Sequence, residues 1–131
     1  MSESGNINHD AVLRARVALL GSEKPSVAQR VAAYRVLVRV SPLAYLPLLA
    51  VALGKYARRD FADRPDIALA LLAESVTAAR RVHELEPARS DLLVDALLGY
   101  RGQLARMGRQ SEFPAVDGQI ALVRRGAGGA R

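Results

Sequence analysis

Residues that could catalyse a reaction are few and widely separated in this sequence. The only histidines are His9, near the start, and His83, which lies in a helical pattern beside two arginines, and there is no cysteine. Two separated histidines without carboxylates at ligand spacing predict no metal site. His83 is interpreted as a solvated or partly packed helical residue rather than a general base.

Other polar residues do not form a catalytic arrangement either. Ser75 and Glu74 are neighbours within a predicted helix, where adjacent side chains point apart, so they form no nucleophile and base pair. Gly99, Gly102 and Gly108 do not follow a strand and therefore make no phosphate loop. Capping and solvation at turns explain two pairs of carboxylates: Asp63 with Asp66, and Glu84 with Glu86. The sequence predicts neither an enzyme nor a cofactor.

One polar pattern is periodic. Arg35, Arg80 and Arg125 follow one another at intervals of 45 residues, and we call these three the arginine ladder. Guanidinium groups at equivalent points of a repeat would bind carboxylates or phosphates. Neighbouring arginines widen the candidate protein-binding set to Arg35, Arg39, Arg80, Arg81, Arg124 and Arg125. The alternative is a solvated outer face in which the arginines pair with Glu84 or Asp66.

Composition limits the fold and the environment. The 131 residues are half hydrophobic, 5% aromatic and free of tryptophan, which favours a helical core of Ala, Leu and Val. The net charge is +6, and all basic residues except Lys24 and Lys55 are arginine, so part of the charge could reflect genome composition. Residues 1–10 lack the pattern of a signal peptide, which together with the absence of cysteine favours the cytoplasm.

An uncharged run covers positions 40–54, and a membrane-spanning segment is one interpretation of it. A spanning helix needs about 20 apolar residues, whereas this run is shorter and contains Pro42 and Pro47. The run is interpreted as a buried helix with a turn before it.

Apolar periodicity predicts an all-α fold of about five to six helices. The central one lies in the stretch from Ile67 to Pro87, where Pro87 ends the helix, and its apolar stripe needs a partner. The expected helices span about 10–20, 25–40, 47–61, 65–86, 91–107 and 112–125. Asp10, Asp63 and Ser111 are expected as N-caps, and Pro47 as a helix start. Residues 1–9 are expected to be a disordered leader, 10–125 one helical-repeat domain, and 126–131 a disordered tail.

The helices repeat. Pro42 and Pro87 are 45 residues apart, Tyr56 and Tyr100 are 44 apart, and the Ala-Leu pairs that begin at 52 and 96 are also 44 apart. Gly21 and Gly108, 87 apart, are separated by about two such periods. A period of this length in a helical pattern is typical of a solenoid of helical hairpins. The alternative is an irregular helical bundle in which these spacings coincide by chance.

The segment IALALLAESVTAARRVHELEP and the later LLVDALLGYRGQLARMGR resemble the long-period tetratricopeptide repeats of actinobacterial proteins. The matching positions are Ala68, Leu69, Glu74, Val76, Pro87, Leu93, Leu97, Leu104, Met107, Gly108 and Arg109. The pattern is degenerate, since Asp63 replaces a Gly and Phe113-Pro114 replace an Ala-Leu. The resemblance implies a right-handed stack of hairpins that binds other proteins and carries out no reaction.

Two classes of function follow from these observations. The first is a non-catalytic protein-interaction module, such as an adaptor or regulatory partner, which binds an acidic peptide or protein through the arginines. The second is nucleic-acid binding through the same basic face, against which stand few aromatic residues and an even scatter of Asp and Glu. Because the last helix has no following partner, Val116, Ile120 and Val123 are expected to stay partly uncovered, which predicts a homodimer or a hetero-complex through an end.

Overall fold

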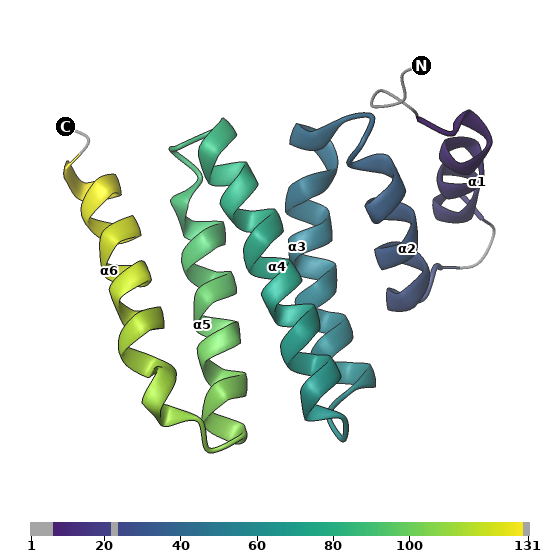
Figure 1. The fold of residues 1–131 in the computed structure, drawn as a ribbon. Coiled ribbons are helices and arrows are strands. Elements are labelled where there is room, and N and C mark those ends of the chain that lie inside the picture. Colours follow the sequence, from purple (N-terminus) through teal and green to yellow (C-terminus); the bar gives the residue numbers. More distant parts are fainter. Residues whose placement is uncertain (1–6, 22–23, 130–131) are drawn as a thin grey trace.

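The protein is a row of helices. The computed structural model describes residues 7–21 and 24–129. Its elements are α1 (His9–Leu19), α2 (Val27–Leu37), α3 (Pro42–Asp60), α4 (Pro65–Leu85), α5 (Ser90–Arg106), the 3₁₀ helix η1 (Gln110–Glu112) and α6 (Phe113–Gly129). Figure 1 shows the helices side by side, running alternately in opposite directions, with the two ends of the chain at opposite ends of the row. No strand occurs among the described residues, which confirms the all-α prediction.

Side-chain caps start the first two helices. The Asn8 side chain accepts a hydrogen bond from the Ala11 amide at 3.0 Å, so the N-cap of α1 is Asn8 and the predicted cap Asp10 is wrong. Asp10 instead lies in the first turn, where its carboxylate interacts favourably with the positive end of the helix dipole. Ser26 caps α2 in a reciprocal box with Gln29, in which each side chain accepts from the other's backbone amide.

Prolines begin the two longest helices. Pro42 is the first residue of α3, and Pro65 is the first residue of α4, where a missing amide proton removes no helical bond. The prediction that Pro47 starts a helix is wrong, because Pro47 lies inside α3. An interior proline costs about 3 kcal/mol, and the apolar side chains that α3 buries on both sides of it outweigh that cost. Asp63 makes no cap either, since the N-cap position of α4 is Arg64 without a side-chain bond.

Most of the uncharged run at 40–54 belongs to α3, which packs against α2, α4 and α5. Among the residues that the structure describes, no helix has both the length and the apolarity needed to cross a membrane.

Each helix packs against its neighbours in the chain, and α3 also contacts α5. The contact between α3 and α4 is the most extensive, since alanines at the crossing let the two backbones approach closely. The buried alanines of these two helices are Ala50, Ala52, Ala57, Ala68, Ala78 and Ala79. One continuous core therefore runs along most of the row, joined by a smaller cluster between α1 and α2.

Burial repeats with the same period as the sequence. Leu37 in α2 and Val82 in α4, 45 residues apart, are both completely buried. Leu53 in α3 and Leu97 in α5, 44 residues apart, are 0% and 2% exposed. We call α2, α4 and α6 the first helices and α1, α3 and α5 the second helices. Within the described part of the chain, the fold is thus a helical repeat of alternating first and second helices.

The last helix is better covered and longer than the sequence predicts. The prediction that Val116, Ile120 and Val123 stay partly uncovered is wrong, since their exposures are 4%, 5% and 8%. One side of α6 packs against α5, and all three side chains belong to the main core cluster. Ser111 belongs to η1, and α6 begins two residues later. The helix continues to Gly129, past the predicted end at 125; positions 1–6 of the expected leader and 130–131 of the expected tail lie outside the described residues.

Two glycines provide a test of these helix boundaries. Gly108, after α5, has a φ of 70°, whereas Gly118 lies within α6, and a Cβ there would meet nothing within 4 Å. Replacing Gly108 by alanine should lower the free energy of unfolding by about 1 kcal/mol, because the left-handed backbone strains an L side chain. Gly118→Ala should raise it by about 0.5–1 kcal/mol through helix propensity. Urea denaturation of both variants checks the opposite signs, and equal signs would contradict the boundary.

Candidate interaction surface

The chemical candidates from the sequence have structural roles. Ser75 is 3% exposed, and its hydroxyl donates to the Ala50 carbonyl oxygen of α3 at 2.7 Å. Glu74 points away from it and bonds Arg35, which agrees with the prediction that the two side chains point apart. A hydroxyl that donates to a backbone carbonyl has no base to activate it.

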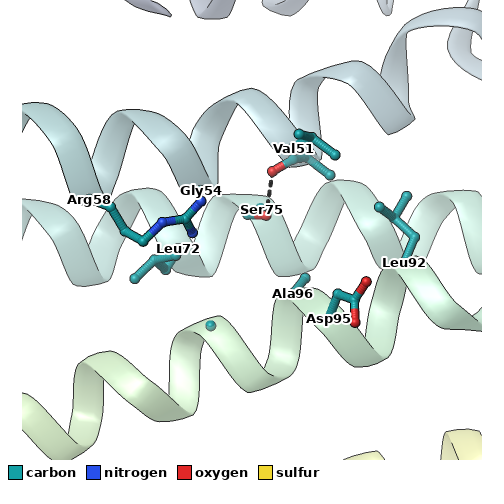
Figure 2. A pocket seen from close by; sticks show the side chains of 10 residues that line it. Val51, Gly54, Arg58, Leu72, Ser75, Leu92, Asp95 and Ala96 are labelled. Carbon is teal, nitrogen blue, oxygen red and sulfur yellow. Dashed lines mark hydrogen bonds between the residues drawn. The ribbon is translucent and has the colours of Figure 1, made fainter.

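Ser75 also lines a groove of about 170 Å³ on the side of the second helices, where α3, α4 and α5 meet. Figure 2 shows Arg58 and Asp95 at opposite ends of this groove, with the Ser75 hydrogen bond between them. The Arg58 guanidinium lies across Gly54, where a Cβ would come within 3.3 Å of it. The groove carries opposite charges at its two ends and apolar side chains between them. Its lining residues include no nucleophile within reach of a base.

The histidines lie apart. His9 is the first residue of α1, rather than part of a leader, and His83 is near the end of α4. The Nδ1 atom of His83 is buried and has no hydrogen-bond partner among the described residues. Residues 7–21 and 24–129 contain no group of three or more His, Cys, Asp or Glu side chains that could hold a metal ion.

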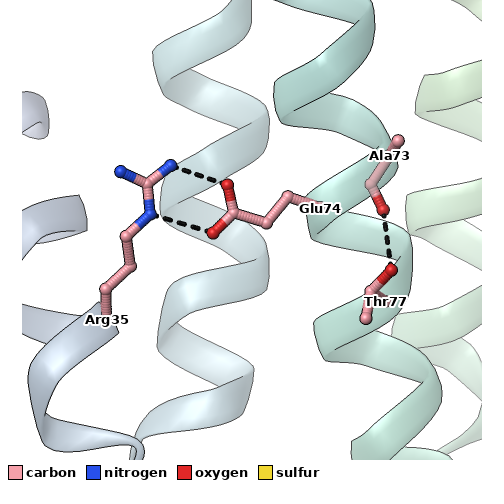
Figure 3. Close-up of polar contacts among 4 residues, drawn as sticks. All are labelled: Arg35, Ala73, Glu74 and Thr77. Atoms are coloured by element: carbon pink, nitrogen blue, oxygen red, sulfur yellow. Dashed lines mark hydrogen bonds and ion pairs between the residues drawn. The ribbon is translucent and has the colours of Figure 1, made fainter.

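The arginine ladder does connect the first helices. The Arg35 guanidinium of α2 donates two hydrogen bonds to the Glu74 carboxylate of α4, at 2.9 and 2.6 Å (Figure 3). Arg80 of α4 donates to the Gln119 side-chain oxygen of α6 at 2.6 Å. Both pairs span 39 residues. Arg35 and Arg80 thus reach equivalent acceptors on the next first helix, and the predicted partners Glu84 and Asp66 are wrong.

The two bridges differ in charge. The hydrogen bonds to Glu74 raise the pKa of Arg35 above its ordinary value, with partial burial opposing them. That cation is therefore neutralised within the chain, whereas Arg80 bonds a neutral amide and keeps its charge uncompensated. The Arg35 and Glu74 side chains are 45% and 37% exposed. An ion pair this exposed contributes well under about 1 kcal/mol, so the buried core, and not the ladder, holds the helices together.

The third ladder residue and its neighbours have other surroundings. Arg125 on α6 is exposed and has no partner among the described residues. Arg81 is exposed on α4, and Arg39 follows α2 in an exposed turn. Arg124 lies with Arg101 beside a groove between α5 and α6, away from the ladder. Arg35 and Arg80 thus make equivalent contacts between first helices, whereas Arg124 lies beside a different groove.

The surface beside these arginines is formed mostly by short side chains. Small side chains are exposed along α4 at Ala70, Ala73 and Thr77. The Thr77 hydroxyl donates a hydrogen bond to the Ala73 carbonyl oxygen. The equivalent positions of α6, 45 residues later, are exposed too: Ala115, Gly118 and Leu122. We call the exposed stripes of α4 and α6, with Arg80, Arg81 and Arg125, the first-helix face. Most of these side chains are short, and the long cations lie beside them.

A shallow pocket of about 170 Å³ opens next to Arg80, lined on α4, α5 and α6 by Ala73, Val76, Leu97, Tyr100, Val116 and Gln119. Sequence reasoning did not include Gln119 or this pocket. The signal was present, because Gln29, Glu74 and Gln119 keep the same interval of 45 residues as the arginines. A pocket with both apolar and polar walls beside an uncompensated guanidinium can hold an apolar side chain next to a carboxylate.

A third bridge joins the last two helices. Arg101 of α5 donates to both carboxylate oxygens of Asp117 at 2.7 and 3.2 Å, and its guanidinium lies 3.8 Å from the centre of the Phe113 ring. These hydrogen bonds lower the pKa of Asp117. Because the folded-state pKa is the lower one, the pair favours folding above the ordinary aspartate range, and the contribution disappears as the pH falls through the folded-state value.

The comparisons with known proteins add no relative. No protein-family model matches the chain, and neither a curated protein nor a solved structure matches it. The geometry above is therefore the basis for a functional proposal.

Proposed function

We propose that the chain is a non-catalytic protein-interaction module of the tetratricopeptide-repeat-like kind, an adaptor or regulatory partner that works in the cytoplasm. The ligand is an acidic segment of another protein, bound along the first-helix face. The observation that carries the proposal is the uncompensated Arg80, which donates to neutral Gln119 at the edge of a small pocket and next to exposed Arg81.

Charge complementarity gives this face its preference for an acidic ligand. Arg81 and Arg125 are exposed, permanently charged and without partners among the described residues. A guanidinium forms two parallel hydrogen bonds with one carboxylate, which fixes orientation as well as charge. The pocket beside Tyr100 then selects acidic segments that also carry an apolar residue.

The test compares two charge reversals in similar positions. Arg81→Glu changes the first-helix face, and the control Arg59→Glu changes an exposed arginine in the last turn of second helix α3. The probe is a fluorescein-labelled decaglutamate peptide, followed by fluorescence anisotropy. We expect Arg81→Glu to weaken binding about tenfold, or about 1.4 kcal/mol, and Arg59→Glu to change it less than about threefold. Equal losses in the two variants would overturn the proposal.

Nucleic-acid binding is the alternative that the same arginines support. A labelled DNA duplex in the same assay, at two salt concentrations, separates it from peptide binding. Phosphate attraction alone falls steeply with salt and ignores which arginine is reversed. Tighter binding of the duplex than of the peptide, lost equally in both variants, would replace the protein-interaction proposal with this alternative.

A further inference from the structure

The row of helices is unfinished at its first end. Leu13 and Val17 in α1 and Leu20 just after it are 61%, 59% and 83% exposed, and their spacing places them on one side of the helix. The equivalent residues 87 positions later, in and just after α5, are Tyr100, Leu104 and Met107, of which Leu104 is 0% exposed. In α5 this side is covered, since Leu104 is buried and Tyr100 and Met107 are half-buried, whereas in α1 it is an exposed apolar stripe.

The row is also unfinished at its other end. Second helix α5 contacts both α3 and α4, so it lies in the groove between them. The corresponding groove between α5 and α6 has a volume of about 550 Å³, and no described residue outside these two helices lines it. Its walls combine apolar and charged side chains: Leu98, Ile120, Ala121, Arg101, Asp117 and Arg124. Leu98 is 44% exposed, so the groove presents apolar surface to a further second helix.

The last arginine of the ladder, Arg125, has no acceptor among the described residues. This donor lies at the groove end of the row. Gln29 on α2 occupies the acceptor position, 45 residues before Glu74, and no first helix precedes it among the described residues. The Gln29 oxygen already accepts from the Ser26 amide. A carbonyl oxygen has a second lone pair, and the side chain is exposed, so a further donor can bind.

We propose that copies of this chain associate head to tail, with α1 of one copy seated in the α5–α6 groove of another. First and second helices alternate along the row, and among the described residues the outermost ones are second helix α1 and first helix α6. A second copy therefore continues the alternation, covers the stripe of α1, and brings Arg125 of one chain toward Gln29 of the other.

A second copy is favoured over another protein because both halves of the joint occur in one chain and repeat a contact that the chain already makes. The α1–groove joint reproduces the packing of α5 on α3 and α4. Such a joint is heterologous, so it leaves one free stripe and one free groove in every assembly and adds further copies as concentration rises. The two surfaces share Arg125, but the inference does not depend on peptide binding, whose test changes Arg81, a residue outside the joint.

Sedimentation velocity of the full chain over a concentration series tests the inference. We expect the mass to rise from one chain of 14.1 kDa toward two and more. Val17→Glu puts a charge in the stripe, and Ala121→Glu puts one in the groove; each variant alone should remain a single chain. Mixed together they should form pairs that stop at two chains, since one variant retains an intact groove and the other an intact α1. Both new charges are negative, so they cannot attract each other across the opposite joint.

Other outcomes would overturn the inference. A single chain at every concentration would do so, while leaving the peptide assay unaffected. Association of Ala121→Glu that equals the wild type would indicate a symmetric α1–α1 contact. Leu48→Glu, on an exposed position of α3 away from both surfaces, is the control for a general effect of added charge and should associate like the wild type.

Discussion

Replacing either Leu53 or Leu97 by alanine should lower the free energy of unfolding by about 3 kcal/mol. Both side chains are buried, at 0% and 2% exposure, and they occupy equivalent positions of α3 and α5. A leucine-to-alanine change in a packed core costs about 2–5 kcal/mol, from lost transfer energy and from the cavity that remains. The account predicts that the two costs are large and similar.

Urea denaturation monitored by circular dichroism measures these costs. Leu48→Ala is the matched control, because Leu48 lies on α3 at 46% exposure. Surface substitutions of this kind change stability by less than about 0.5 kcal/mol. A large loss for Leu53→Ala together with a control-sized loss for Leu97→Ala would show that the two second helices are not equivalent.

An aspartate at Val82 should have a still larger effect, of about 4 kcal/mol or more at pH 7. Val82 is 0% exposed in the middle of the core cluster. A carboxylate there would be buried without a partner, which is among the most costly substitutions in proteins. Val82→Thr is the control of equal size, whose hydroxyl can bond the carbonyl of the preceding turn, and it should cost about 1–2 kcal/mol.

The pH dependence separates charge from shape at this position. Burial raises the folded-state pKa of a carboxyl group above the unfolded one. The folded state then binds the proton more tightly, so Val82→Asp should regain stability as the pH falls from 7 toward 5, relative to Val82→Thr. A cost independent of pH would mean that water reaches this position and that the core between the repeats is open.

The sequence predicts the repeat well because burial is periodic. The intervals of 44 and 45 residues in the sequence reappear as equal burial of Leu53 and Leu97, since each helix must hide the same stripe. Helix boundaries were harder to predict. Asp63 has a side chain that can cap a helix, but the N-cap position of α4 falls one residue later, at Arg64. A cap depends on the path of the turn, which apolar periodicity does not report.

The candidate surface could be predicted only in part. Equal spacing placed Arg35 and Arg80 at equivalent points, and the structure agrees. Their acceptors lie on other helices, at Glu74 and Gln119, so the direction in which each guanidinium points depends on how the helices are packed. Packing also decides what is exposed at the end of the row. Val116 on α6 is buried, and the open surface there is the groove between α5 and α6.

The most direct test of the central claim maps the bound peptide on the protein. Amide chemical shifts of the ¹⁵N-labelled chain are followed by NMR during titration with the decaglutamate peptide. The account predicts that the shifts concentrate on α4 and α6, around Arg81 and Gln119, and that those of α3 stay unchanged. Shifts that concentrate on α3, or that spread evenly over all exposed arginines, would contradict it.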